Sequence, residues 1–232
     1  MRIVKRMVCL ANSRKVSGRC IAGIELDRGG QRLGWLRPVS SRPTREVSDR
    51  ELRYPDGSAP RVLDILEVAL LRPLPEEHQQ ENWLLDPASS ARYVGRFPWD
   101  RLAALLDPPR ALWIDGYHTF HGHNDRVPHE QAKRLVDSLR LIHVESLTLV
   151  VFAPHETFGD PRRRIQGRFV HSGVEYRLWV TDPVYERVYL AKPDGVYRIS
   201  DCYLTVSLGE PHEGYCYKLI AAIIEREGAG QR

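Results

Sequence analysis

The sequence lacks the features that would place it in a membrane. It contains no apolar run of about 18 residues or more, so it predicts no transmembrane helix. Its first residues, MRIVKRMVCLANS, have too few consecutive apolar side chains for a signal-peptide core and instead favour a strand. We therefore expect a cytoplasmic protein without a membrane partner.

Cysteine is scarce, with only Cys9, Cys20, Cys202 and Cys216 in 232 residues. None forms a C-x-x-C pair, which argues against a zinc ribbon and a thioredoxin-like redox motif. We expect buried, reduced thiols. A four-ligand metal site, formed if the two cysteines near each end met in space, remains an alternative.

The short motifs of several enzyme classes are also absent. There is no G-x-S-x-G, no papain-like cysteine context and no H-E-x-x-H, and the segment ANSRK lacks the spacing of a P-loop. The sequence thus predicts no catalytic residue and no cofactor, and it favours a protein that is not an enzyme.

The composition is that of a globular protein, with 42% hydrophobic and 28% charged residues. A chain of this length can bury one large core or two small ones without disulfides or metal. The formal net charge of +4 permits binding to a polyanion but does not require it.

The positive charge is concentrated in two segments that contain no acidic residue. NSRKVSGR holds Arg14, Lys15 and Arg19, and PRRRIQGR holds Arg162, Arg163, Arg164 and Arg168. We interpret both as loops between strands. They are either solvated turns or patches that meet phosphate groups.

Strand-like segments occupy both ends of the chain and helix-like segments its middle. Asp27–Gly30 and Ser172-Gly173 are hairpin signals, residues 40–61 are typical of a long exposed loop, and 214–225 favours a strand, with a helix as the alternative. PWDRLAALLD predicts a short helix, and PHEQAKRLVDSLRLIH predicts an amphipathic helix over 128–143. This order suits two small barrels of about five strands each, or a single large antiparallel sheet.

Several segments resemble the motif series of a known family. CLANSRKVSGRCIAGIEL, GWLRPVS, HQQENWLLD, NDRV and YLTVSLGEPHEGYCYKLIAAII are similar to motifs of the dual OB-containing domain family, a group of small prokaryotic proteins with no settled activity. The resemblance spans residues 7–224. It implies a mainly β protein with a few short helices, in which residues 1–95 form a first OB-like barrel, 96–143 a helical connecting segment and 144–232 a second OB-like barrel in tandem.

OB barrels often bind single-stranded nucleic acid by stacking bases on aromatic side chains beside a basic groove. Trp35 and Arg37 are two residues apart and lie on the same side of a predicted strand, whereas Trp113 and Trp179 lie in apolar surroundings and are expected in a core. The predicted interface comprises Arg14, Lys15, Arg19, Trp35, Arg37, Asn82, Trp83, Arg126, Arg163, Arg164, Tyr215 and Lys218.

The segment HTFHGHNDRV brings His118, His121, His123 and Asp125 close together in sequence and resembles a metal site. The family resemblance covers only Asn124 to Val127. We therefore predict a structural turn, fixed by Asn124 and Asp125, with Arg126 reaching an acid or a phosphate.

We expect a non-catalytic module of a prokaryotic system that binds single-stranded DNA or RNA. A metal-dependent nuclease is one alternative, because the histidine segment or Glu210, His212 and Glu213 could hold a cation. An accessory subunit that binds a separate enzyme is another, because a fold does not fix a function.

Overall fold

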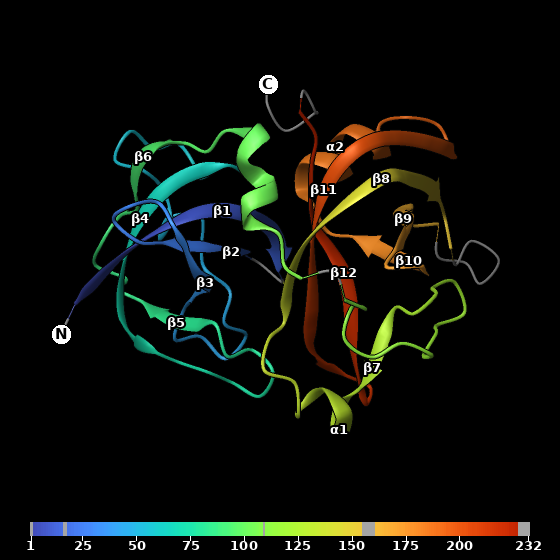
Figure 1. Cartoon of the computed structure of the whole chain (residues 1–232), viewed down its shortest axis with the longest axis horizontal. Coiled ribbons are helices and arrows are strands. Elements are labelled where there is room, and N and C mark those ends of the chain that lie inside the picture. Colours follow the sequence, from blue (N-terminus) through green and yellow to red (C-terminus); the bar gives the residue numbers. More distant parts are fainter. Residues whose placement is uncertain (1, 16–17, 109, 155–160, 227–232) are drawn as a thin grey trace. The chain divides into compact units, whose positions relative to one another are not determined.

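The computed structural model describes residues 2–15, 18–108, 110–154 and 161–226. The predicted fold class is confirmed, because strands dominate and the helices are short. The chain forms two compact units (Figure 1): Met1–Leu105 with Val136–Ser138, and Leu106–Leu135 with Leu139–Arg232. The segment 96–143, expected to connect the barrels, is shared between them. No helix in the described residues is long and apolar enough to span a membrane.

The first unit is a six-stranded sheet followed by a 3-10 helix. Its elements are β1 (Ile3–Lys15), β2 (Gly18–Leu26), β3 (Arg32–Val39), β4 (Asp64–Pro73), β5 (Asn82–Leu85), β6 (Arg92–Arg96) and η1 (Trp99–Leu105). The pairings β1–β2–β3–β5–β4–β1 form a ring, and β6 extends it beside β4. Met7, Cys9, Ile21, Leu36 and Leu66 are among the side chains that fill its core.

The second unit contains a closed five-stranded barrel. Its elements are β7 (Arg126–Pro128), α1 (His129–Ala132), β8 (Leu139–Phe152), β9 (Arg164–His171), β10 (Val174–Val180), α2 (Pro183–Leu190), β11 (Gly195–His212) and β12 (Tyr215–Ile224). The ring runs β8–β9–β10–β12–β11–β8, with a parallel pairing only between β10 and β12. This is the arrangement of a five-stranded Greek-key barrel.

The two predicted hairpins are confirmed. Ser172 and Gly173 both have positive φ angles, 49° and 78°, as a tight two-residue turn between twisted strands requires. In the β2–β3 turn, the Asp27 carboxylate accepts a hydrogen bond from the Gln31 backbone N–H at 2.8 Å. These local signals fix which residues face each other across each hairpin.

The predicted amphipathic helix over 128–143 is wrong in most of its length. Only His129–Ala132 is helical, and β8 begins at Leu139. Leu139 to Val144 pair with β11, so these residues form part of the sheet and not the apolar stripe of a helix. Val136, an apolar residue of the predicted helix, is 75% exposed. Long-range strand pairing has therefore overridden the local helical period.

Other local predictions need correction. The segment 40–61 is not simply an exposed loop, because Val47, Leu52 and Tyr54 are buried in the first core. The basic segments are not simply loops: β1 runs to Lys15, and Arg164 begins β9. Helix α2 escaped the sequence analysis, although Asp182 followed by Pro183 is a strong start signal. The Asp182 carboxylate accepts from the N–H groups of the first helical turn.

A candidate nucleic-acid interface on the second barrel

The outer face of β9 and β10 carries polar and aromatic side chains because the strands alternate. Ile165 and Phe169 point into the barrel core. The side chains of Arg164 and Arg168, one position before each of them, therefore point outward. On β10, Tyr176 and Leu178 are buried while Arg177 and Trp179 remain partly accessible.

The strand register arranges this outer face in rows. Arg168 lies opposite Thr148 on β8 and opposite Arg177 on β10. On the other side of β8, Arg198 of β11 also lies opposite Thr148 and continues the same row. Gln166 and Trp179 form the next row. Three arginines thus share one row of the sheet.

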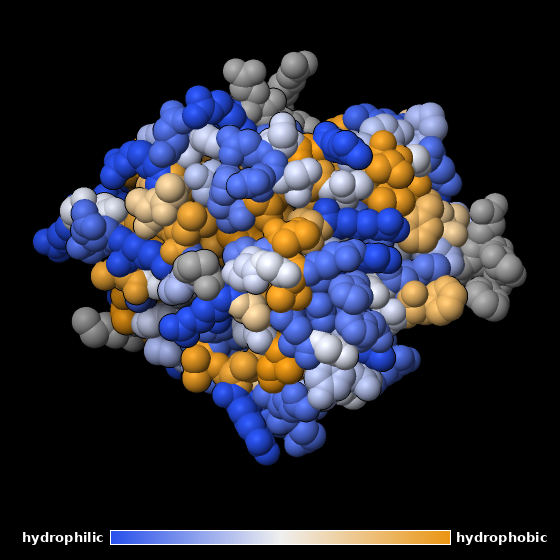
Figure 2. Space-filling view, turned by 45° about the vertical axis from the view of Figure 1, so that its right-hand side comes forward, coloured by the Kyte–Doolittle hydropathy of each residue, from blue (hydrophilic) through white to orange (hydrophobic). Residues whose placement is uncertain are grey.

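Four aromatic side chains adjoin these rows. The ring centroids of Phe152 and Trp179 are 5.8 Å apart, and the ring of His121 lies 5.6 Å from Phe152 and 6.4 Å from Trp179. Phe120 contacts His121 and is 94% exposed. On the side of the molecule in Figure 2, apolar residues form small patches among hydrophilic ones. Because the Phe120 ring is almost fully exposed, it offers a surface for a planar ligand.

The arginines of this face interact with its aromatic and polar groups. The Arg164 guanidinium lies 4.3 Å from the centroid of the Trp179 ring. Arg168 donates to the Gln166 side chain at 2.8 Å, and Arg177 to the Glu175 carboxylate at 2.9 Å. Burial, together with the positive charge of Arg177, lowers the pKa of Arg168. This part of the face therefore has an excess of positive charge.

A loop before β7 holds the exposed aromatic residues beside β10. His123 and Arg177 exchange two backbone hydrogen bonds, at 3.0 and 3.2 Å. The side-chain amide of Gln166 donates to the His121 carbonyl at 2.8 Å. The loop therefore extends the face past the edge of β10 and presents Phe120 to solvent.

Asn124 and Asp125 fix the shape of this loop, as the sequence predicts. The Asp125 carboxylate accepts from the Thr119 backbone N–H at 2.8 Å. The Asn124 side chain accepts from Gly116 at 2.7 Å and donates to the Glu175 carbonyl at 3.0 Å. Asn124 has a positive φ of 49°, which asparagine tolerates better than most residues.

The three histidines of this segment serve the loop and do not converge on one ion. His118 and His123 stack with centroids 4.3 Å apart. His118 Nδ1 accepts from the Asn124 backbone N–H at 2.8 Å, and His121 Nε2 lies 3.0 Å from the Pro154 carbonyl. Among the described residues, no group of three or more His, Cys, Asp or Glu side chains is placed to hold a metal ion.

Comparison with known protein families matches residues 5–223 to the dual OB-containing domain. The chain belongs to the dual OB-containing domain family. No curated protein matches the chain at a significant level. The family assignment agrees with the strand rings described above and confirms the resemblance carried by the sequence motifs.

In an OB barrel, ligands usually lie on the face of the second and third strands and on the loops between strands one and two and between four and five. In the second barrel of this dual OB protein the second and third strands are β9 and β10. Trp179, expected in a core, instead lies on the outer face of β10. The alternation of Tyr176, Leu178 and Val180 with Trp179 was the signal that places it outside.

Three residues of the predicted interface are buried, which corrects their assignment. Arg37 pairs with Glu81 at 2.9 Å and donates to Ser138 at 2.7 Å. Asn82 is fully buried and donates to the Gln79 side chain. These two side chains have internal partners and cannot contact a ligand at the surface.

Lys218 is the third buried residue. Its side chain is fully inaccessible, and its ammonium group donates to Asp115 at 2.8 Å and to the Ile114 carbonyl at 2.9 Å. Burial lowers the pKa of Lys218, and the nearby Asp115 opposes this shift. The lysine therefore stabilises the second barrel from within.

The other predicted residues lie at several separate places. In the first unit, Arg14 lies opposite Arg19 in the β1–β2 pairing, and Lys15 is the last residue of β1. Arg19 forms an ion pair with Asp49 at 3.1 Å. Trp35 is half-buried on β3. Trp83 lies under the ammonium group of Lys5, at 4.2 Å.

In the second unit, Arg163 is held by Asp194 and by two backbone carbonyls. Arg126 stacks on Tyr215 at 4.0 Å, at the start of β12 and beside the loop between the fourth and fifth strands. Of the predicted residues in the second unit, Arg164, Arg126 and Tyr215 therefore lie on parts of an OB barrel that commonly meet ligands. In the first unit, Arg14, Lys15 and Arg19 flank the loop between the first two strands, and Trp35 lies on the third strand.

Proposed function

We propose that this dual OB protein binds single-stranded DNA or RNA on the outer face of β9 and β10. The observation that carries the proposal is the direct opposition of Arg168 and Arg177 beside the ring of Trp179. Like charges that face each other across strands destabilise a sheet. A bound polyanion removes that cost, because its phosphates neutralise both guanidinium groups.

The aromatic side chains supply the second half of the interaction. Phe120, which is 94% exposed, offers a ring face of the kind on which bases stack, and stacking of this kind is worth about 1–3 kcal/mol per base. Stacking accepts any base, whereas the arginines bind the backbone. Arg126 and Tyr215 extend the proposed interface toward the β11–β12 loop. We propose that this face binds nucleic acid, and we assign no catalytic step to it.

Fluorescence anisotropy with labelled single-stranded oligonucleotides of about 12 nucleotides, within the usual site size of an OB fold, tests the proposal. We expect binding at low salt, and an affinity that falls steeply as the salt concentration rises, because bound counterions are released. Absence of binding to both DNA and RNA at low salt would refute the proposal.

The matched variants are Arg177→Gln on the face and Arg72→Gln on β4 of the first unit. Both positions carry accessible arginines, and Arg72 is exposed. We expect weaker binding and a shallower salt dependence only for Arg177→Gln. Equal loss in both variants would indicate attraction by the net charge of the chain and not by this face.

A further inference from the structure

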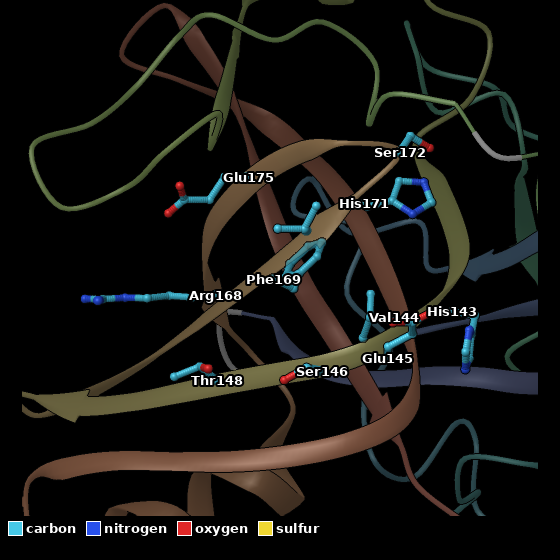
Figure 3. A pocket seen from close by; sticks show the side chains of 11 residues that line it. His143, Val144, Glu145, Ser146, Thr148, Arg168, Phe169, His171, Ser172 and Glu175 are labelled. Atoms are coloured by element: carbon cyan, nitrogen blue, oxygen red, sulfur yellow. The ribbon is translucent and has the colours of Figure 1, made fainter.

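A cavity of about 610 Å³ adjoins the proposed interface in the second barrel (Figure 3). It forms where β8 and β9 separate: the two strands pair from Thr148 and Arg168 onward, while the earlier residues of β8 pair only with β11. Its lining includes His143, Glu145, Ser146, Thr148, Arg168 and His171. This volume lies within the range of about 300–1,000 Å³ that is usual for small-ligand sites.

Arg168 belongs both to the cavity and to the row of arginines on the outer face. A phosphate bound by Arg168 and Arg177 would therefore lie at the mouth of the cavity. The sugar and base of the same nucleotide can then enter the space between β8 and β9, where Figure 3 shows side chains from both strands. The cavity is thus placed for one nucleotide of a bound strand.

Two residues of the cavity lining, His171 and Glu145, offer hydrogen-bond acceptors. His171 Nε2 lies 3.0 Å from the carbonyl oxygen of Arg110, and a carbonyl can only accept, so the proton of His171 lies on Nε2. Burial lowers the pKa of His171, which keeps the imidazole neutral and leaves Nδ1 as an acceptor. Glu145, whose side chain is exposed at the cavity, adds a carboxylate.

We infer that this cavity binds the base of a nucleotide and favours adenine and cytosine, whose amino groups lie at C6 and C4, over thymine. An amino group donates hydrogen bonds to acceptors such as Glu145 and His171, whereas thymine has a carbonyl oxygen and a methyl group at the corresponding edge. The inference rests on the proposed function, since it concerns one nucleotide of the same strand.

The test compares the affinities of oligo-dC, oligo-dA and oligo-dT of about 12 nucleotides for the full chain. We expect the first two to bind about 10-fold more tightly than oligo-dT, the discrimination that one well-formed base contact provides. Glu145→Gln should remove much of this preference, because the amide that replaces the carboxylate donates as well as accepts. Glu76→Gln, which removes the same charge from an exposed position of the first unit, is the control.

A second pair of variants tests the cavity by filling it. Ser146→Phe places a ring at the cavity, whereas Ser200→Phe places one on the paired strand, where Ser200 lies opposite Ser146 but does not line the cavity. Both serines are exposed, so neither change disturbs a core. We expect loss of base preference with Ser146→Phe only.

The possible results distinguish the base cavity from the proposed function. Equal affinity for all three oligonucleotides, or a preference that survives both Glu145→Gln and Ser146→Phe, overturns the base cavity and leaves the proposed function standing. If no oligonucleotide binds at low salt, the proposed function and the inference both fail.

Discussion

Arg168 and Arg177 lie directly opposite each other on β9 and β10 of the second barrel. Each has a polar partner of its own, Gln166 for Arg168 and Glu175 for Arg177, but the partner of Arg168 carries no charge. The two cations therefore repel each other, and burial together with the charge of Arg177 lowers the pKa of Arg168. In the free protein this repulsion lowers stability, whereas a bound anion would neutralise both guanidinium groups.

This relationship predicts opposite effects of Arg177→Gln on binding and on stability. We expect the free energy of unfolding to stay the same or to rise by up to about 0.5 kcal/mol, because a like-charge pair is removed. Binding of single-stranded nucleic acid should weaken at the same time. Urea unfolding and anisotropy on the same sample measure both quantities. A variant that is less stable and binds as well as the wild type contradicts this account of the pair.

Phe120→Ala should weaken binding without an effect on the fold. The ring is 94% exposed, so its loss removes almost no packing, whereas the loss of one stacked base costs about 1–3 kcal/mol of binding free energy. Tyr93→Ala, at an exposed aromatic position in the first unit, is the control. The hypothesis is wrong if both variants bind equally well, with the affinity of the wild type.

Gly122→Ala should disrupt the loop that carries Phe120 and His121. A Cβ atom at Gly122 would lie 1.8 Å from a carboxylate oxygen of Asp125, so either the loop or the Asp125 side chain must move. We expect destabilisation of about 1–3 kcal/mol together with weaker binding. Gly34→Ala is the matched control, since no atom lies within 4 Å of a Cβ atom there. Thermal unfolding and anisotropy should separate the two variants, and equal behaviour would show that the loop is not constrained at this point.

Lys218→Met tests whether the buried lysine stabilises the barrel or takes part in binding. The change leaves the Asp115 carboxylate without its cation and the Ile114 carbonyl without its donor, so we expect a loss of about 3 kcal/mol of stability. In the double variant with Asp115→Ala the loss should be smaller than the sum of the two single losses. Any Lys218→Met protein that remains folded should keep its affinity. Weaker binding at unchanged stability would indicate that Lys218 takes part in binding.

The stability of the first unit should depend on pH through Glu67. Hydrogen bonds from Arg6 and then from Arg92 lower the pKa of Glu67 below its usual 4.5. A lowered carboxyl pKa contributes stability above the unfolded value, and this contribution is lost as the pH falls below 4.5. Glu67→Gln should therefore cost about 0.5 kcal/mol at about pH 7 and less at about pH 3. Unfolding of both proteins at the two pH values is the measurement; a cost that grows at low pH would contradict the assigned ion pairs.

The sequence predicted the elements whose signals are local. The hairpin at Ser172-Gly173 follows from the φ angles that a two-residue turn requires, and the strand predicted over 214–225 was confirmed as β12. The turn around Asn124 and Asp125 was also predictable, because short polar side chains commonly bond to their own backbone. The family motifs added the number and type of the barrels.

The segment from Leu139 to Val144 could not be assigned from its own pattern. Its apolar residues fit a helical stripe, but β11 supplies a pairing partner from about 60 residues further along the chain, and that partner selects the strand. The amino-acid sequence by itself therefore determines the composition, the local turns and the family. Only the closure of the second barrel decides that Arg177 lies opposite Arg168 while Lys218 faces inward, because the residues that lie opposite each other depend on strand register, and register is set by residues distant in sequence.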